Sequence, residues 1–138
     1  MIVLDTNVLS ELMRPRPDDR VLAWVDSLPI AELGTTAINA AELRHGVARL
    51  APGHRGDALT AAVREVLDGD FRGRIAPFDA GSAIEFAAVV SARESGGRPI
   101  AVADAQIAAI CRQLGAPLAT RNVQDFDNTD LEIVDPWR

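Results

Sequence analysis

Short apolar runs alternate with longer amphipathic segments along this chain. The runs at residues 2–4, 31–35, 74–78, 117–120 and 131–134 have the length and apolar character of buried strands. Between them, apolar residues recur with helical spacing at 7–13, 18–28, 37–50, 57–67 and 99–114, and from residue 80 to a stop near Gly96 and Gly97. This alternation of strands and helices predicts an α/β fold with a parallel sheet.

Capping residues support these boundaries. Thr36 and Asp79 directly precede two of the predicted helices and are suited to N-caps, and Gly115 is suited to end the last helix. The sequence contains no internal repeat, low-complexity tract or long linker. Its length of 138 residues is that of one ordinary domain, so we expect a single domain over residues 1–138.

Polar residues follow the predicted strands directly. These residues are Asp5, Thr6, Thr35, Thr36, Asp79, Thr120 and Arg121. In an open parallel sheet, ligands bind outside the carboxyl ends of the strands. We therefore expect these side chains to face one cleft.

Two aspartates stand out against their apolar surroundings. Asp5 ends an apolar strand, where it can serve a site or simply cap the following helix. Asp104 lies within a helical stripe formed by Ile100, Ala103, Ile107, Ile110, Cys111 and Leu114. A buried carboxylate needs a partner or a metal, although an acid in the first helical turn also complements the helix dipole.

The other candidate metal ligands give weaker signals. Glu42 points away from the apolar stripe of its helix, which by periodicity alone indicates a solvent-exposed residue. His45 and His54 lack the spacing of a zinc site. Separated carboxylates without histidine or cysteine ligands suit a hard cation such as Mg²⁺ or Mn²⁺. Such a site can activate water for attack on a phosphodiester.

Composition limits the possible functions. The net charge of −6 argues against a general phosphate-binding surface, but residues 44–74 contain six arginines against four acids. The 14 basic residues are all arginine, which excludes mechanisms that need a lysine, such as a P-loop or a Schiff base. Cys111 is the single cysteine, so a disulfide within the chain is excluded and a cytoplasmic location is expected, with no leader peptide and no membrane span.

Four stretches of the chain resemble a known family when taken together. They are MIVLDTNVLSELMRP, TTAINAAELRHG, RPIAVADAQIAAICRQLGAPLATRNVQDF and LEIVDPW. The set is similar to PIN domains of the VapC or FitB type, ribonuclease toxins of toxin–antitoxin pairs, over nearly the whole chain and in the expected order. The resemblance implies a three-layer α/β/α fold with a central, mainly parallel five-stranded sheet. It also implies an endoribonuclease that depends on Mg²⁺ or Mn²⁺.

The resemblance assigns residues as well. It implies that Asp5 and Asp104 bind the metal and that Glu42 completes the acidic cluster. Many PIN domains carry a fourth acid just after the strand that here reads PLAT. Asn122 occupies that place and Asp125 follows it, and we expect Asn122 to face the cleft and Asp125 to have an indirect or structural role. Thr6, Asn7 and Thr120 are expected to orient ligands or water.

The resemblance further implies an RNA substrate, a small antitoxin partner and a homodimer. Leu12, Met13, Trp24 and Leu28 are candidates for an apolar groove that binds the antitoxin, unless they belong to the ordinary core. The sequence leaves two alternatives to a ribonuclease toxin. One is a non-catalytic PIN module that binds RNA or protein. The other is a haloacid-dehalogenase-like phosphatase, which would need an aspartate in place of Asn7 and a lysine.

Overall fold

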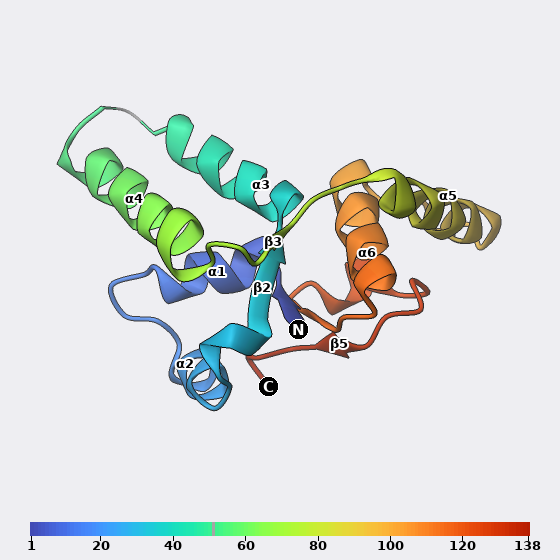
Figure 1. Cartoon of the computed structure of the whole chain (residues 1–138), viewed down its shortest axis with the longest axis horizontal. Helices are drawn as coiled ribbons and strands as arrows, with labels where there is room; N and C mark the ends of the chain where they lie inside the picture. The colour runs from blue at the N-terminus through green and yellow to red at the C-terminus, as the bar shows by residue number, and fades with distance from the viewer. Residues whose placement is uncertain (51) are drawn as a thin grey trace.

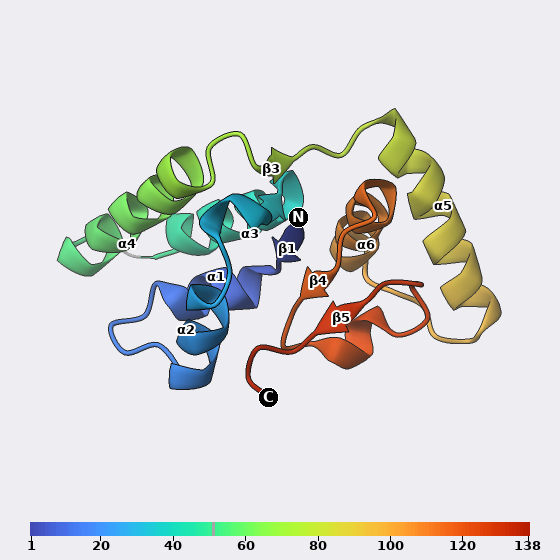
Figure 2. The same ribbon diagram turned by 60° about the horizontal axis from the view of Figure 1, so that its bottom comes forward.

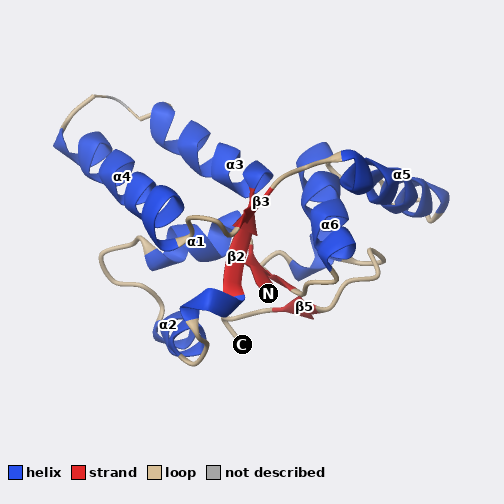
Figure 3. Ribbon diagram, in the orientation of Figure 1, coloured by secondary structure: helices blue, strands red, loops and turns tan. Residues whose placement is uncertain are grey.

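The computed structural model describes residues 1–50 and 52–138 and contains one five-stranded sheet (Figure 3). The strands lie in the order β3-β2-β1-β4-β5, and every pairing is parallel. Their bounds are Ile2–Leu4 for β1, Leu33–Thr36 for β2, Ile75–Ala76 for β3, Leu118–Ala119 for β4 and Ile133–Val134 for β5. The expected five-stranded parallel sheet is confirmed.

Helices cover both faces of this sheet (Figures 1 and 2). On one face lie α1 (Thr6–Leu12), α2 (Asp19–Asp26), α3 (Ala37–Ala48) and α4 (His54–Arg64), which continues into a π-helical segment, η2 (Glu65–Asp70). On the other face lie α5 (Ala80–Ser95) and α6 (Val102–Leu114). Two short 3-10 helices, η1 (Ile30–Glu32) and η3 (Val123–Phe126), complete the elements. The helices are too short or too polar to cross a membrane, in the part of the chain that the structure describes.

Side chains of the strands alternate between two apolar cores, one on each face. Leu4 and Ala119 are buried in the core with the α1–α4 side, while Val3 and Leu118 are buried in the core with α5 and α6. Neighbouring residues on a strand point to opposite faces, so a short apolar run supplies both cores at once. This explains the continuous apolar character of the strands and gives the three-layer α/β/α arrangement.

The order of the strands reverses between β1 and β4. From β1 the chain moves outward to β2 and β3, and it then returns through α5 and α6 to place β4 on the opposite side of β1. Ligands in open α/β sheets bind at such a reversal, beyond the carboxyl ends of the strands. Asp5 follows β1 and Thr120 follows β4, so both lie at this point of the fold.

Several predicted boundaries were wrong for local reasons. The strand expected at 74–78 is confined to Ile75–Ala76, because Pro77 has no N–H to donate to a neighbouring strand. The start of the strand expected at 31–35 is replaced by η1, which follows Pro29. The helix expected at 57–67 begins at His54, and the helix expected from residue 99 begins at Val102 because Ala101 is extended.

Arg93 on α5 is a buried structural residue that the sequence pattern did not reveal. Its Nε donates a hydrogen bond to the carbonyl oxygen of Arg98 at 2.7 Å. Its Nη1 donates to the carbonyl oxygens of Asp125 and Asp127 at 2.9 and 2.8 Å. Only 5% of Arg93 is exposed, so its charge is compensated by these carbonyls. The guanidinium thereby fixes η3, the loop that follows β4.

We expect Arg93→Met to lower the free energy of unfolding by about 2–3 kcal/mol, because buried carbonyls would lose charged donors. Arg98→Met is the matched control. Arg98 forms an ion pair with Asp127 at 3.2 Å in which both side chains are exposed, and such pairs contribute about 0–1 kcal/mol. Urea unfolding measures both. Equal effects of the two variants would show that Arg93 does not hold the loop.

Candidate active site

Asp5 is the centre of a hydrogen-bonded network at the reversal point. It is the N-cap of α1, and its Oδ1 accepts from the backbone N–H of Thr6 at 2.8 Å. Oδ1 also accepts from Asn39 Nδ2 at 2.9 Å, and Oδ2 accepts from the hydroxyl of Thr120 at 2.7 Å. Only 5% of Asp5 is exposed, so these donors are needed to compensate its burial. The capping role and a site role therefore coexist in this residue.

Asn39, on α3, links Asp5 to Glu42. Its Nδ2 donates to both Asp5 Oδ1 and the Thr6 hydroxyl, the latter at 3.0 Å, and that hydroxyl donates to Glu42 Oε1 at 2.7 Å. The hydroxyl of Thr36 donates to Asn39 Oδ1 at 2.7 Å and orients the amide. Sequence reasoning missed Asn39. The only signal in the sequence was weak: Asn39 lies four residues before Leu43, on the apolar face of its helix, while its hydrogen-bond partner Asp5 is distant in the chain.

A second branch of the network fixes the loop after β4. Asn7 Nδ2 donates to the Thr120 hydroxyl at 3.2 Å, and Asn7 Oδ1 accepts from the backbone N–H of Arg121 at the same distance. The Thr120 hydroxyl also accepts from the backbone N–H of Asn122 at 3.0 Å. Thr6, Asn7 and Thr120 thus connect the ends of β1 and β4 and orient the carboxylates around them.

Asp104 lies in the first turn of α6 and is partly buried. The pKa of its carboxyl is raised from 3.8 to about 6. Burial is the largest cause, the charges of Asp5, Asp125 and Glu42 act in the same direction, and the charge of Arg93 lowers the pKa. These four carboxyl groups, Asp5 after β1, Glu42 on α3, Asp104 on α6 and Asp125 on η3, are called the acidic cluster below. Asp5, Glu42 and Asp104 are the acids that the sequence singled out, and their role as metal ligands stays a prediction.

Asp125 and Asn122 are both at this end of the molecule, but their contributions differ. The charge of Asp125, like those of Asp5 and Glu42, raises the pKa of Asp104. Asn122 contributes a backbone N–H to Thr120, and both Asn122 and Asp125 line one cleft. The expectation that Asn122 faces the site and that Asp125 has an indirect or structural role stays a prediction.

The chemistry of this donor set suits a hard divalent cation. The side chains are carboxylates, hydroxyls and amides, all oxygen donors of the kind that Mg²⁺ and Mn²⁺ take. Within residues 1–50 and 52–138, no three His, Cys, Asp or Glu side chains are grouped closely enough to hold a metal ion. The types of donor therefore fit a hard cation, while the described residues do not form a closed set of ligands.

A large, mainly apolar cleft of about 780 Å³ begins at the cluster and runs between α1, α3 and α4. Thr6 and Glu42 line it near the cluster, and Met13, Val47 and Leu59 supply apolar surface. Of the four residues expected to form a partner groove, only Met13 lines this cleft. Leu12, Trp24 and Leu28 are instead partly buried against the core on the α1–α4 side, because α2 packs on α1 there.

The comparisons with known proteins agree with this geometry. The family model described as PIN domain matches residues 2–131. The chain belongs to the PIN domain family. It is 42% identical over 137 residues to Toxin FitB of Neisseria gonorrhoeae, with 99% of each chain covered. It is 38% identical over 137 residues to VapC ribonuclease Y4jK of Sinorhizobium fredii, covering 99% of this chain and 98% of that one.

Solved structures give the same relationship. The structure of FitAB bound to an IR36 DNA fragment matches with a TM-score of 0.94 and 40% identity, covering 100% of this chain and 96% of that chain. The structure of FitAcB from Neisseria gonorrhoeae matches with a TM-score of 0.93 and 41% identity, covering 100% and 99%. The PIN fold expected from the sequence is therefore confirmed.

The raised pKa of Asp104 predicts a pH-dependent stability. Because the folded state holds this proton more tightly than the unfolded chain does, stability is lost as pH rises from about 4 to about 6. Asp104→Asn removes that loss, so at neutral pH and without metal it should be more stable than wild type by about 1 kcal/mol, after allowance for solvent screening. Urea unfolding at several pH values measures the difference. A difference between the two proteins that does not change with pH would contradict this electrostatic account.

The fourth-acid assignment gives a separate prediction. If Asp125 acts within the cluster, Asp125→Asn should lower metal-dependent cleavage by at least about tenfold, whereas Asn122→Ala should have a smaller effect. Steady-state RNA cleavage measures both, and circular dichroism checks folding. A larger loss of cleavage activity in Asn122→Ala than in Asp125→Asn would support the expectation from the sequence that Asn122 faces the site and that Asp125 has an indirect role.

Proposed function

We propose that this protein is a metal-dependent endoribonuclease toxin that hydrolyses RNA phosphodiester bonds and is neutralised by a cognate antitoxin. The observation that supports this most directly is the buried Asp5 carboxylate at the reversal of strand order, which hydrogen bonds of Asn39 and Thr6 connect to the Glu42 carboxylate. The names of the relatives, Toxin FitB and VapC ribonuclease, agree with it.

In this proposal Asp5, Asp104 and Glu42 hold Mg²⁺ or Mn²⁺, with Asp125 nearby. The cation would lower the pKa of a bound water and neutralise charge on the phosphate during in-line attack. Asn39 and Thr120 keep Asp5 oriented through their donated hydrogen bonds. Thr6 restrains the Glu42 carboxylate. The pKa of Asp104 is raised to about 6, and a bound cation would favour the ionised form of this carboxyl.

The proposed partners follow from the relatives. Similar solved structures are complexes called FitAB and VapBC, and we expect a small antitoxin here as well. The apolar cleft between α1, α3 and α4 is the surface best suited to it, because it combines apolar walls with access to Glu42. Met13 remains a candidate for this contact. We also expect a homodimer, which sedimentation of the purified protein would measure.

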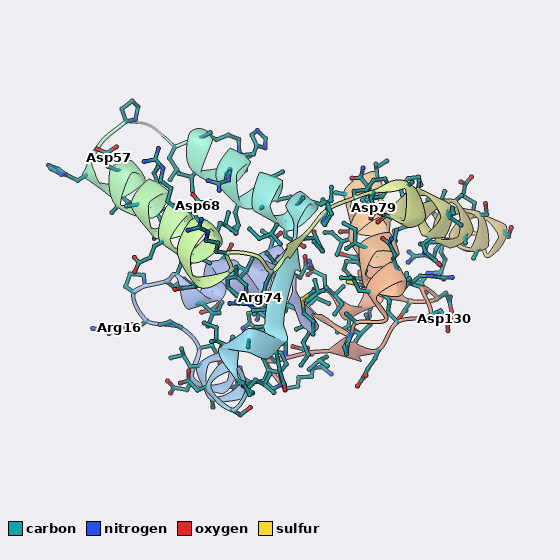
Figure 4. The ribbon with its side chains drawn as sticks, in the orientation of Figure 1. Arg16, Asp57, Asp68, Arg74, Asp79 and Asp130 are labelled. Carbon is teal, nitrogen blue, oxygen red and sulfur yellow. The ribbon has the colours of Figure 1, made fainter. Side chains whose placement is uncertain are left out.

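The test is cleavage of a single-stranded RNA by purified protein, with Mg²⁺, with Mn²⁺ and with EDTA. We expect cleavage only with metal, and we expect Asp5→Asn and Asp104→Asn each to reduce it by at least about a hundredfold because each removes a proposed ligand. Asp57→Asn is the matched control, since Asp57 is exposed at the distal end of α4 (Figure 4).

Thermal unfolding gives an independent readout of the metal. Mg²⁺ should raise the melting temperature of wild type and of Asp57→Asn, and it should have little effect on Asp104→Asn. A wild-type protein that binds RNA but fails to cleave it with any divalent cation would favour the alternative of a non-catalytic PIN module. Cleavage that persists in EDTA would contradict the proposed metal dependence.

A further inference from the structure

A second cleft, of about 580 Å³, opens on the other side of the acidic cluster, along the β4–β5 edge of the sheet. Asp125 and Asn122 line it and connect it to the candidate site. Arg121 and Arg138 line it as well. The cleft thus brings two guanidinium groups next to Asp125, with Asp135 as a second acid in its wall, in a protein whose net charge is −6.

Arg121 is held at both ends. Its backbone N–H donates to Asn7 Oδ1 at 3.2 Å, one residue beyond the Thr120 that contacts Asp5. Its guanidinium carbon lies 5.0 Å from the centre of the Trp137 ring, a cation–π contact. Trp137 is only 6% exposed and forms part of the core, so the ring is a fixed support. Arg121 itself is exposed, and its planar donors are free to face solvent.

Arg138 adds a second, looser positive charge. Its Nε lies 3.5 Å from Asp135 Oδ2, and its side chain is 89% exposed. An ion pair this exposed is weak and leaves most donors of the guanidinium available. The two side chains are therefore restrained to different degrees. Arg121 is held by its stacking on Trp137, whereas Arg138 can change its side-chain conformation.

An RNA strand is the ligand whose chemistry matches this cleft. A strand that presents one phosphate to the acidic cluster must continue past it, and its next phosphates need cationic partners because the cluster repels them. Arginine is suited to this role, since its planar fork binds phosphate oxygens in pairs and stacks on aromatic rings at the same time. The mainly apolar cleft is also lined by two arginines, Arg14 and Arg55. Arg14 is paired with the buried Glu11 at 3.3 Å, whereas Arg121 is stacked on Trp137 with its donors facing solvent.

We propose that Arg121, supported by Trp137 and assisted by Arg138, binds an RNA phosphate adjacent to the bond that is cleaved. This inference rests on the proposed ribonuclease function, and it names the path of the substrate beside that site. Arg121 acts in binding the strand and takes no part in the chemical step.

Fluorescence anisotropy with a labelled single-stranded RNA, in EDTA so that the RNA stays intact, tests the proposal. Arg121→Gln should weaken binding about fivefold to tenfold and reduce the slope of log K against log salt by about 0.7, the value for one phosphate contact on a single strand. With Mg²⁺, the same variant should raise KM and leave kcat nearly unchanged, as expected for lost binding in both ground and transition states.

Arg72→Gln is the matched control, with the same change of charge. Arg72 is exposed and precedes β3, at the opposite edge of the sheet from β5. If Arg121→Gln and Arg72→Gln have equal effects on the affinity and on the salt slope, the proposal is wrong. It is also wrong if Arg121→Gln leaves RNA binding intact and instead weakens the complex with an antitoxin, since the cleft would then belong to the protein partner.

The result can be separated from the ribonuclease proposal. Wild-type cleavage of RNA together with an unaffected Arg121→Gln variant overturns only the substrate path. Absence of wild-type cleavage overturns the ribonuclease proposal, while the binding experiment still reports on Arg121.

Discussion

The burial of a charged Asp5 at the reversal of strand order is the constraint on which the rest of the site depends. A carboxylate that is only 5% exposed must receive hydrogen bonds, and the donors come from α1, α3 and the loop after β4. Satisfying Asp5 therefore fixes the relative positions of these elements. The same bonds orient Thr6 and, through it, Glu42. In this fold, the same aspartate caps a helix and holds the site together, so both depend on the same hydrogen bonds.

Asp104 differs from Asp5 in its surroundings, which disfavour its charge. Its pKa rises to about 6 because burial and three neighbouring carboxylates act against its charge, with Arg93 as the opposing cation. Such an arrangement lowers the stability of the protein, and in the proposed function the binding of a cation would relieve the repulsion. Stability is given up at a functional site in this way in many proteins. Arg93 limits the cost, because it also ties the loop that carries Asp125.

The sequence predicted the parts of the fold that depend on local pattern. The strand runs, the caps at Thr36 and Asp79 and the polar residues after the strands were readable because their signals lie within a few residues. Glu42 was not predictable from periodicity, since an exposed glutamate on a helix resembles any solvated residue, and only the family resemblance singled it out. Asn39 and Arg93 depend on partners distant in the chain. Trp24 packs against the core, and its spacing could not separate a core residue from one that binds a partner, because both kinds of residue have the same helical spacing.

The acidic cluster lies between two clefts of different chemistry, and this arrangement bears on inhibition. The cleft between α1, α3 and α4 is apolar and reaches Glu42 and Thr6, whereas the cleft at the β4–β5 edge reaches Asp125 and presents Arg121. A protein segment bound in the first cleft would meet the carboxylates without covering Arg121. Such an inhibitor would compete with the cation rather than with the whole RNA strand, because the phosphate contact at Arg121 lies on the other side of the cluster. With RNA on the proposed path past Arg121, an inhibitor in the apolar cleft would therefore block cleavage at the acidic cluster while leaving the Arg121 contact with the strand in place.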